Sequence, residues 1–353
     1  MFFKEARDLV MNNTEKQFIE ILSKAIRNDR NIDYYEGVKW SNLINLAGEH
    51  KVEGIIYPLI AKNSLKFNID NSLLEELKKF SFYTAISEVR KISYLENIFK
   101  EFEQNNIKVI ALNGLILRKF YPQPEQRSMY DIDLLVYKDD IKRVTDILKA
   151  IEYDVEVKNK SSIRFVHRLY PIIEIHWQLV NGEELDSSVW NRLIKDKILN
   201  TEISTLGYED FLVYIVNNII NNINKNGLLL RQFTDIVLFV EANEDKIDWT
   251  SFKVKIKEQG IEKFVLIIFS LCNILFELEL PEVLLDRDIK YSPNIDILIE
   301  NLLLGRMYEI NNSEKIVSNA ASEDYSFLDN IKKFIRSKKL DKNRDKIIRW
   351  LGI

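Results

Sequence analysis

Apolar residues recur at helical spacing in the first hundred residues and again after about residue 185, whereas the stretch between them alternates at strand spacing. In the first part, the longest predicted helix runs from about residue 80 to residue 104. In the middle part, the pattern predicts helices at 115–121 and from Asp139 or Asp140 onward, and strands at 107–112, 130–136, 162–167 and 171–179. The predicted fold class is α+β, with a small mixed β-sheet domain at 106–184 between helical domains at 1–105 and 185–353.

The C-terminal part is predicted to be helical throughout. Apolar spacing places helices at 209–225, 228–242, from Trp249 onward, 261–278 and 294–307. The helix at 261–278 holds the longest apolar run of the chain, which is too short to cross a bilayer and predicts a buried helix. The last twenty or so residues combine many Lys and Arg with apolar positions. This indicates a solvated amphipathic helix or a surface that binds RNA or an acidic partner.

Two carboxylates lie one residue apart in the second predicted strand. Alternate strand residues share a face, so Asp131 and Asp133 point the same way, while Ile132 and its apolar neighbours form the core-facing set. Two carboxylates so close repel each other unless a cation lies between them, and a divalent metal such as Mg²⁺ is the simplest explanation. In the strand at 171–179, Glu174 and His176 share a face in the same way. The alternative is an ordinary solvent-exposed sheet face.

A glycine turn precedes the carboxylate pair. Gly114 follows an apolar strand and opens a helix, where free backbone amides can bind a phosphate if no side chain is in the way. Arg127 lies four residues before Asp131, and its guanidinium suits either phosphate oxygens or an ion pair with Glu125 or Asp131. His176 is either a polar cleft residue or a hydrogen-bonded, partly buried histidine.

The composition is that of a globular protein. The 353 residues are 46% hydrophobic and 29% charged, and the net charge of −4 disfavours a protein with a global basic field for nucleic acid. The single cysteine, Cys272, rules out an intramolecular disulfide and suits a reducing compartment. The first residues lack the apolar core of a signal peptide. We therefore expect a cytoplasmic protein without a membrane partner.

These motifs together resemble the nucleotidyltransferase superfamily of DNA polymerase beta type, and within it a bacterial family of uncharacterised nucleotidyltransferases. The resemblance covers about 70 residues and is carried by three motifs: Leu112-Asn113-Gly114, the run from Arg127 to Val136 with its Asp-x-Asp, and Glu174-Ile-His-Trp177. The chain departs from that pattern where it has Asn113 in place of a common Lys and Leu115 in place of a frequent Ser.

The resemblance implies an enzyme that transfers a nucleoside monophosphate from an NTP, with ATP the expected donor, to a small-molecule or peptide acceptor and releases pyrophosphate. It implies Mg²⁺ or Mn²⁺ ions in a two-metal arrangement, held by Asp131, Asp133 and Glu174. It also implies nucleotide contacts from Asn113, Gly114, Arg127 and His176. Arg231 and Asp235, four residues apart on a predicted helix, would line the far wall of the cleft or form an i,i+4 ion pair.

Two other interpretations stay open. A catalytically degenerate nucleotide-binding or toxin-neutralising partner is favoured by Asn113 and Leu115, which remove a charge and a hydroxyl from the phosphate turn. A glycosyltransferase also uses Asp-x-Asp, to hold a nucleotide-sugar diphosphate. Such enzymes usually carry a larger nucleotide-binding sheet before the motif, whereas the preceding hundred residues here are helical.

Overall fold

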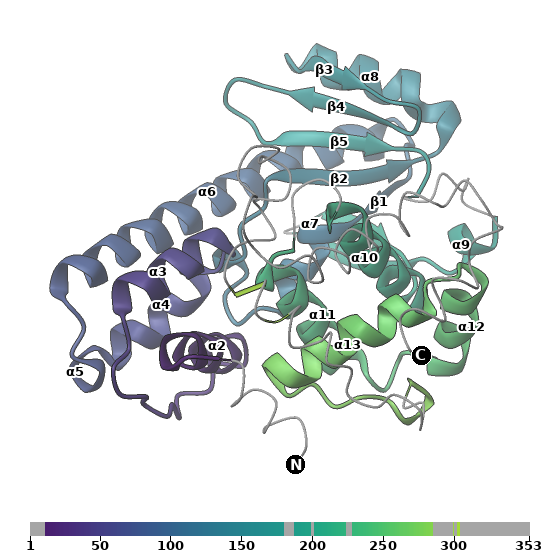
Figure 1. The fold of residues 1–353 in the computed structure, drawn as a ribbon. Coiled ribbons are helices and arrows are strands. Elements are labelled where there is room, and N and C mark those ends of the chain that lie inside the picture. The colour runs from purple at the N-terminus through teal and green to yellow at the C-terminus, as the bar shows by residue number, and fades with distance from the viewer. Residues whose placement is uncertain are drawn as a thin grey trace, which may run out of the picture.

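The computed structural model describes residues 11–179, 187–198, 201–223 and 228–284, together with 299, 302 and 303. A mixed seven-stranded sheet lies between N-terminal and C-terminal helices (Figure 1). Its strands follow the order β3 (Asp154–Lys158), β4 (Ser162–Val166), β5 (Ile172–His176), β2 (Asp131–Val136), β1 (Val109–Ala111), β7 (Thr201–Thr205) and β6 (Ile194–Ile198). The α+β prediction is therefore confirmed.

The centre of the sheet combines parallel and antiparallel pairs. β2 runs parallel to β5 and antiparallel to β1, and β1 runs parallel to β7. The outer pairs, β3 with β4, β4 with β5 and β6 with β7, are antiparallel. In β2, Ile132 and Leu134 are buried while Asp131 and Asp133 are only partly buried, as the strand alternation predicts. One face at the middle of the sheet is therefore polar.

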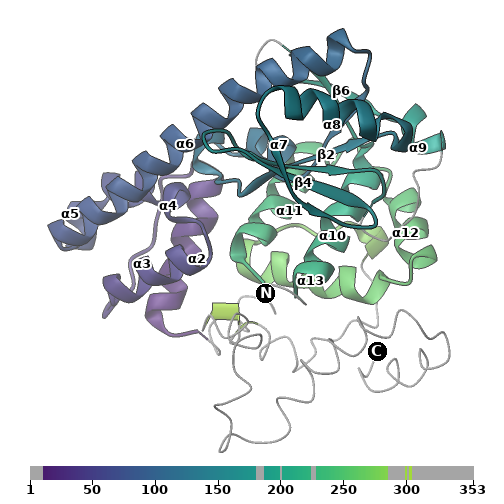
Figure 2. The same cartoon turned by 90° about the horizontal axis from the view of Figure 1, so that it is seen from above.

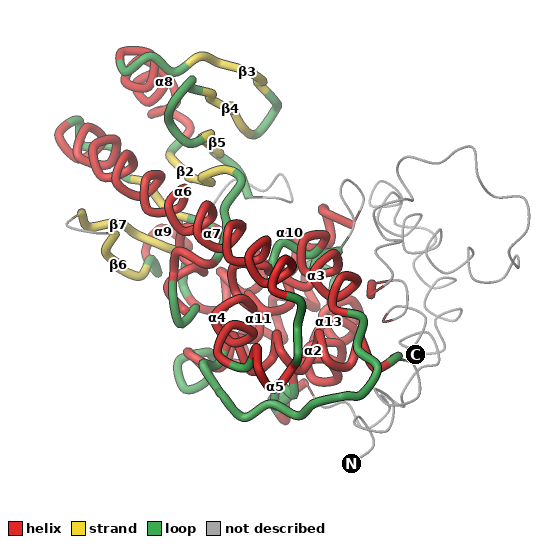
Figure 3. Tube along the Cα trace, turned by 90° about the vertical axis from the view of Figure 1, so that its left-hand side faces the viewer, coloured by secondary structure: helices red, strands yellow, loops and turns green. Residues whose placement is uncertain are grey.

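The helices flank this sheet on both sides. On the N-terminal side are α2 (Asn13–Ile26), α3 (Trp40–Glu49), α4 (Glu53–Lys62), α5 (Ser64–Phe67) and α6 (Asn71–Gln104). Three helices alternate with the strands along the chain: α7 (Asn113–Leu117), α8 (Ile141–Ala150) and α9 (Ser187–Asn191). Four follow the last strand: α10 (Tyr208–Ile223), α11 (Leu230–Asn243), α12 (Trp249–Glu258) and α13 (Glu262–Phe276). Short 3₁₀ turns lie at Arg118–Phe120, Pro124–Gln126, Lys138–Asp140 and Glu282–Leu284. Figures 1 and 3 show α6 and α8 on one side of the sheet and α10 on the other.

The long helix α6 joins the sheet to the N-terminal helices. Asp70 caps its N-terminus by accepting a hydrogen bond from the Ser72 amide, and the helix packs against α4 and α8 (Figure 2). Buried apolar residues from all three parts of the chain, such as Phe18, Leu134 and Phe233, belong to one core cluster. Among the described residues, no helix is long and apolar enough to cross a membrane.

Three strands were not predicted from the sequence. β3 is an exposed edge strand, and its two valines, Val155 and Val157, remain 41% and 43% exposed, so its alternation has no core face to mark it. β6 and β7 lie in the part that was predicted to be wholly helical, so that prediction is wrong for residues 194–198 and 201–205. They are short and rich in polar residues, and β7 is held by pairing with β1 and by a hydrogen bond from Thr205 Oγ1 to the Ala111 carbonyl.

The domain boundaries stay a prediction, although the sheet takes β6 and β7 from beyond residue 185. The basic C-terminal residues lie outside the described part, as does the predicted helix at 294–307 except for residues 299, 302 and 303, which are helical.

Candidate active site

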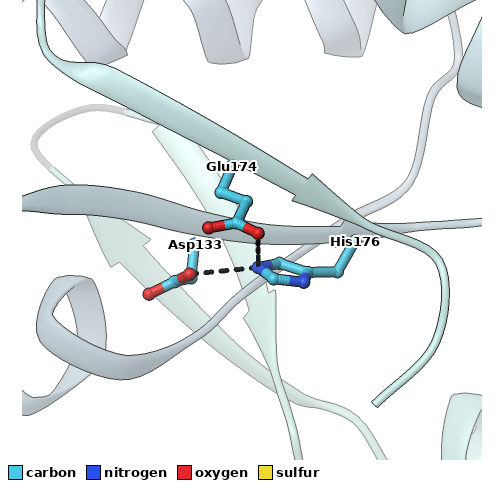
Figure 4. A group of neighbouring side chains, drawn as sticks. All are labelled: Asp133, Glu174 and His176. Atoms are coloured by element: carbon cyan, nitrogen blue, oxygen red, sulfur yellow. Dashed lines mark hydrogen bonds and ion pairs between the residues drawn. The ribbon is translucent and has the colours of Figure 1, made fainter. Parts of the chain in front are cut away.

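Three polar side chains meet where β2 and β5 pair. The parallel register places Asp133 beside Glu174, and His176 follows two residues later on the same face. The Asp133 Oδ1 and His176 Nε2 atoms are 3.0 Å apart, and His176 Nε2 is 4.0 Å from Glu174 Oε1 (Figure 4). In the described part of the chain, these residues offer one ligand atom each within 4.8 Å of one another, a group that could hold a metal ion.

Asp131 lies on the same face, beside Ile172 of β5. Its pKa is raised to about 6, first by burial and then by the negative charges of Asp133 and Glu174. Arg164, which lies opposite Glu174 on β4, and His176 partly offset this rise. The carboxylates are therefore crowded enough that one of them resists ionisation, a condition that a bound cation would relieve.

Asp133 behaves differently because donors surround it. Burial acts to raise its pKa, but the hydrogen bond and charge of His176, together with the Asn113 amide, lower it below the usual value. His176 shows the matching effect, since burial acts to lower its pKa while Asp133 and then Glu174 raise it. The two side chains are thus hydrogen-bonded inside the polar face, and each favours the charged form of the other.

Asn113 ties this face to helix α10. Its Nδ2 donates to Asp133 Oδ2 at 2.7 Å and to the Tyr214 hydroxyl at 3.0 Å, and its Oδ1 accepts from Asn218 Nδ2 at 2.9 Å. Its φ of 45° lies in the left-handed region, which asparagine tolerates better than most residues. Tyr214 and Asn218 carry no sequence signal that distinguishes them from other residues of an amphipathic helix, and the sequence analysis missed them.

The side chains of Arg127 and Met129 occupy the space next to Gly114 where another residue would have its Cβ. A Cβ there would overlap Arg127 Nη1 and lie 2.8 Å from Met129 Cγ. The close approach of these two side chains is therefore one physical requirement for glycine at this position. Phosphate binding by its backbone stays a prediction.

Arg127 is buried and paired with a residue of the C-terminal helices. Its Nε and Nη2 atoms donate to the two carboxylate oxygens of Asp235 at 3.1 and 2.7 Å, and the Tyr121 hydroxyl donates to the same carboxylate at 2.8 Å. Burial acts to lower the pKa of Arg127, but Asp235 raises it overall. The ion pair that the sequence offered as an alternative role is present, with Asp235 as partner in place of Glu125 or Asp131. A phosphate contact from Arg127 stays a prediction.

Arg231 does not bind Asp235. Its Nη1 donates to the Ser128 carbonyl at 2.6 Å and to the Ser128 hydroxyl at 3.0 Å. Burial and the neighbouring Arg127 lower its pKa, and Asp235 only partly offsets them. The i,i+4 ion pair predicted as one alternative is therefore absent, and α11 uses both side chains to hold the loop that leads into β2.

Ser162 and Arg164 of β4 adjoin the carboxylates. The buried Ser162 hydroxyl donates to Glu174 Oε1 at 2.7 Å, which fixes the orientation of that carboxylate. Tyr130, directly before Asp131, is 71% exposed, and the Arg164 guanidinium lies 5.2 Å from the centre of its ring. Ser162 could be sought by its place in an adjacent strand, but its alignment with Glu174 depends on a register that the sequence does not define.

Comparison with known proteins gives one family match. The model of a family described as "Uncharacterised nucleotidyltransferase" matches residues 36–277. No curated protein matches the chain.

Three solved structures show some similarity. The antibiotic-resistance factor ANT(2'')-Ia is 9% identical, covering 50% of this chain and 97% of its own, with a TM-score of 0.39. The lincomycin-bound lincosamide antibiotic adenylyltransferase LnuA is 19% identical, covering 41% and 93%, with a TM-score of 0.32. An antigenic nucleotidyltransferase-like protein from Paracoccidioides brasiliensis is 12% identical, covering 55% and 95%, with a TM-score of 0.31.

Proposed function

Because the chain belongs to the uncharacterised nucleotidyltransferase family, we propose that it transfers a nucleoside monophosphate from an NTP to a hydroxyl of a small-molecule or peptide acceptor. ATP is the expected donor. In this reaction the acceptor oxygen forms a bond to the α-phosphorus, the bond from that phosphorus to the β-phosphate oxygen breaks, and the hydroxyl proton and pyrophosphate leave. The observation that carries the proposal is the crowded face on which Asp131, Asp133 and Glu174 lie together.

The residues present fit a divalent metal. Asp131, Asp133 and Glu174 offer hard oxygen ligands on adjacent strands, and burial, followed by the negative charges of Asp133 and Glu174, raises the pKa of Asp131. Bound Mg²⁺ or Mn²⁺ would supply Lewis-acid stabilisation of the triphosphate and of the attacking oxygen.

Two side chains orient the proposed metal ligands. Ser162 holds Glu174 in place, and Asn113 holds Asp133 through its second oxygen. Asn113 brings hydrogen bonds but no charge to the turn where relatives often have Lys. The same fact supports the alternative of a degenerate nucleotide-binding partner, and activity decides between the two.

The test is pyrophosphate release by the full-length protein with each NTP, Mg²⁺ or Mn²⁺, and cell extract as acceptor source. Asp133→Asn should abolish release because it removes a proposed metal ligand. Asp139→Asn is the matched control, since Asp139 is exposed and lies outside the site. If the parent releases no pyrophosphate yet binds NTP, the degenerate partner is the better account. If Asp133→Asn releases pyrophosphate as fast as the parent, the site is wrong.

A further inference from the structure

We propose that His176 is itself a metal ligand, and that its imidazole makes this site prefer a first-row transition-metal dication such as Mn²⁺ over Mg²⁺. The inference rests on the proposed function for its metal dependence and adds the identity of the ion. It concerns a residue that the sequence resemblance assigns to nucleotide binding rather than to the metal.

The distances between the donor atoms support this role. In an octahedral site with metal–ligand bonds near 2.1 Å, donor atoms are about 3.0 Å apart when adjacent and about 4.2 Å apart when opposite. The 3.0 Å from Asp133 Oδ1 to His176 Nε2 matches adjacent ligands, and the 4.0 Å from His176 Nε2 to Glu174 Oε1 falls between the two cases. The ligand atoms of all three side chains lie within 4.8 Å of one another, so a small inward movement of the side chains would bring them onto one ion.

The surroundings of His176 leave its Nε2 directed at carboxylates. Its partner across the parallel register is Leu135, which is buried and apolar, and the polar side chain of β2 that its Nε2 meets is Asp133. The side chain of His176 is 21% exposed, and those of Asp133 and Glu174 are 13% and 20% exposed. The three donors share a partly desolvated environment, in which a metal–ligand bond competes well with hydration.

The ligand chemistry then selects the ion. Imidazole nitrogen suits transition metals, whereas Mg²⁺ favours oxygen donors and gives up its water reluctantly. Carboxylates alone would discriminate weakly between Mg²⁺ and Mn²⁺. Adding one nitrogen donor shifts the preference toward Mn²⁺, so His176 would determine which ion occupies the site. In the competing arrangement, His176 is a protonated partner of Asp133 and stays outside the metal's ligand set.

The experiment titrates full-length parent protein with Mn²⁺, following the free ion by electron paramagnetic resonance, and measures Mg²⁺ affinity by displacement of Mn²⁺. Pulsed electron paramagnetic resonance of the Mn²⁺-loaded parent then detects any directly bound ¹⁴N. His176→Gln removes the imidazole, and His167→Gln is the control, since His167 lies beyond the end of β4 and hydrogen-bonds the Leu169 and Tyr170 amides instead.

We expect ¹⁴N coupling in the parent and in His167→Gln, and none in His176→Gln. The ratio of Mn²⁺ to Mg²⁺ affinity should fall about tenfold in His176→Gln alone. A parent without ¹⁴N coupling, or a His176→Gln that loses both affinities equally, overturns the proposal. The spectrum of the parent needs no variant, so the test survives if His176→Gln folds poorly.

Failure of this inference is distinguishable from failure of the proposed function. A parent that releases pyrophosphate but shows no ¹⁴N coupling refutes the ligand role of His176 alone. A parent with ¹⁴N coupling that turns over no NTP refutes the transfer reaction and leaves the metal site standing.

Discussion

Two polar clusters flank the start of β2, and they are balanced in different ways. In the first, Arg127 and Asp235 form a buried bidentate pair in which Tyr121 satisfies the same carboxylate. In the second, Asp131, Asp133 and Glu174 crowd together on a partly exposed face, and the pKa of Asp131 rises to about 6. A cluster with matched charges and satisfied hydrogen bonds stabilises the fold. A cluster with excess like charge destabilises the fold by electrostatic repulsion, which a bound cation can relieve.

The largest expected effect comes from breaking the balanced cluster. Arg127→Ala leaves Asp235 buried without its guanidinium, which should lower the free energy of unfolding by about 3–5 kcal/mol. Chemical denaturation measures this. The control is Arg143→Ala, whose ion pair with Asp140 is half exposed at the arginine and should be worth about 0–1 kcal/mol.

Arg127→Ala also tests whether the two clusters have separate roles. If Arg127→Ala unfolds no more easily than Arg143→Ala but binds NTP far more weakly, the guanidinium binds phosphate, as the sequence resemblance implies. The two clusters would then form one site.

In the second cluster, removing a charged side chain should raise the free energy of unfolding instead of lowering it. Asp131→Asn should stabilise the metal-free protein at pH 7 by on the order of 1–2 kcal/mol, because it removes a carboxylate whose ionisation the fold disfavours. The pKa of Asp131 is raised in the folded protein from 3.8 to about 6, so the native state binds more protons between these values and loses stability as pH rises through that range.

The gain from Asp131→Asn should therefore be full above about pH 6 and vanish as the pH falls toward 4. Denaturation curves at several pH values without divalent metal measure it. A loss of stability at pH 7, or a gain that does not change with pH, would mean that the carboxylates are not in conflict.

The smallest expected effect concerns orientation rather than charge. Ser162→Ala removes the hydroxyl that donates to Glu174 Oε1, and loss of a hydrogen bond to this proposed metal ligand should weaken Mn²⁺ binding by about tenfold. Ser161→Ala, one residue away, is the control. Metal titration reports the change, and equal affinities for the two variants would show that Glu174 needs no support from β4.

Local pattern was enough to predict the polar face but not the partners of its residues. Strand alternation alone puts Asp131 with Asp133 and Glu174 with His176, because the side-chain period of a strand is fixed. The partner of Arg127 could not be predicted, since Asp235 lies 108 residues further along the chain and its place depends on how α11 packs. The family resemblance and the α+β class are confirmed, and the roles of the site residues stay predictions.

The strands β6 and β7 show the other limit. β7 contributes one strongly buried apolar side chain, Ile203, and joins the sheet through backbone pairing with β1. Such a strand depends on its neighbour rather than on its own hydrophobic pattern. The links from Asn113 to Tyr214 and Asn218 are of the same kind, because they arise only once α10 is packed beside the sheet.

The central claim is that the carboxylates of β2 and β5 bind a nucleotide through divalent metal. Isothermal titration of NTP, with and without Mg²⁺ or Mn²⁺, tests it on the parent, Asp133→Asn and Asp139→Asn. We predict metal-dependent binding by the parent and by Asp139→Asn, and none by Asp133→Asn at an unchanged fold. Binding of NTP and metal by Asp133→Asn as tight as in the parent would contradict the claim.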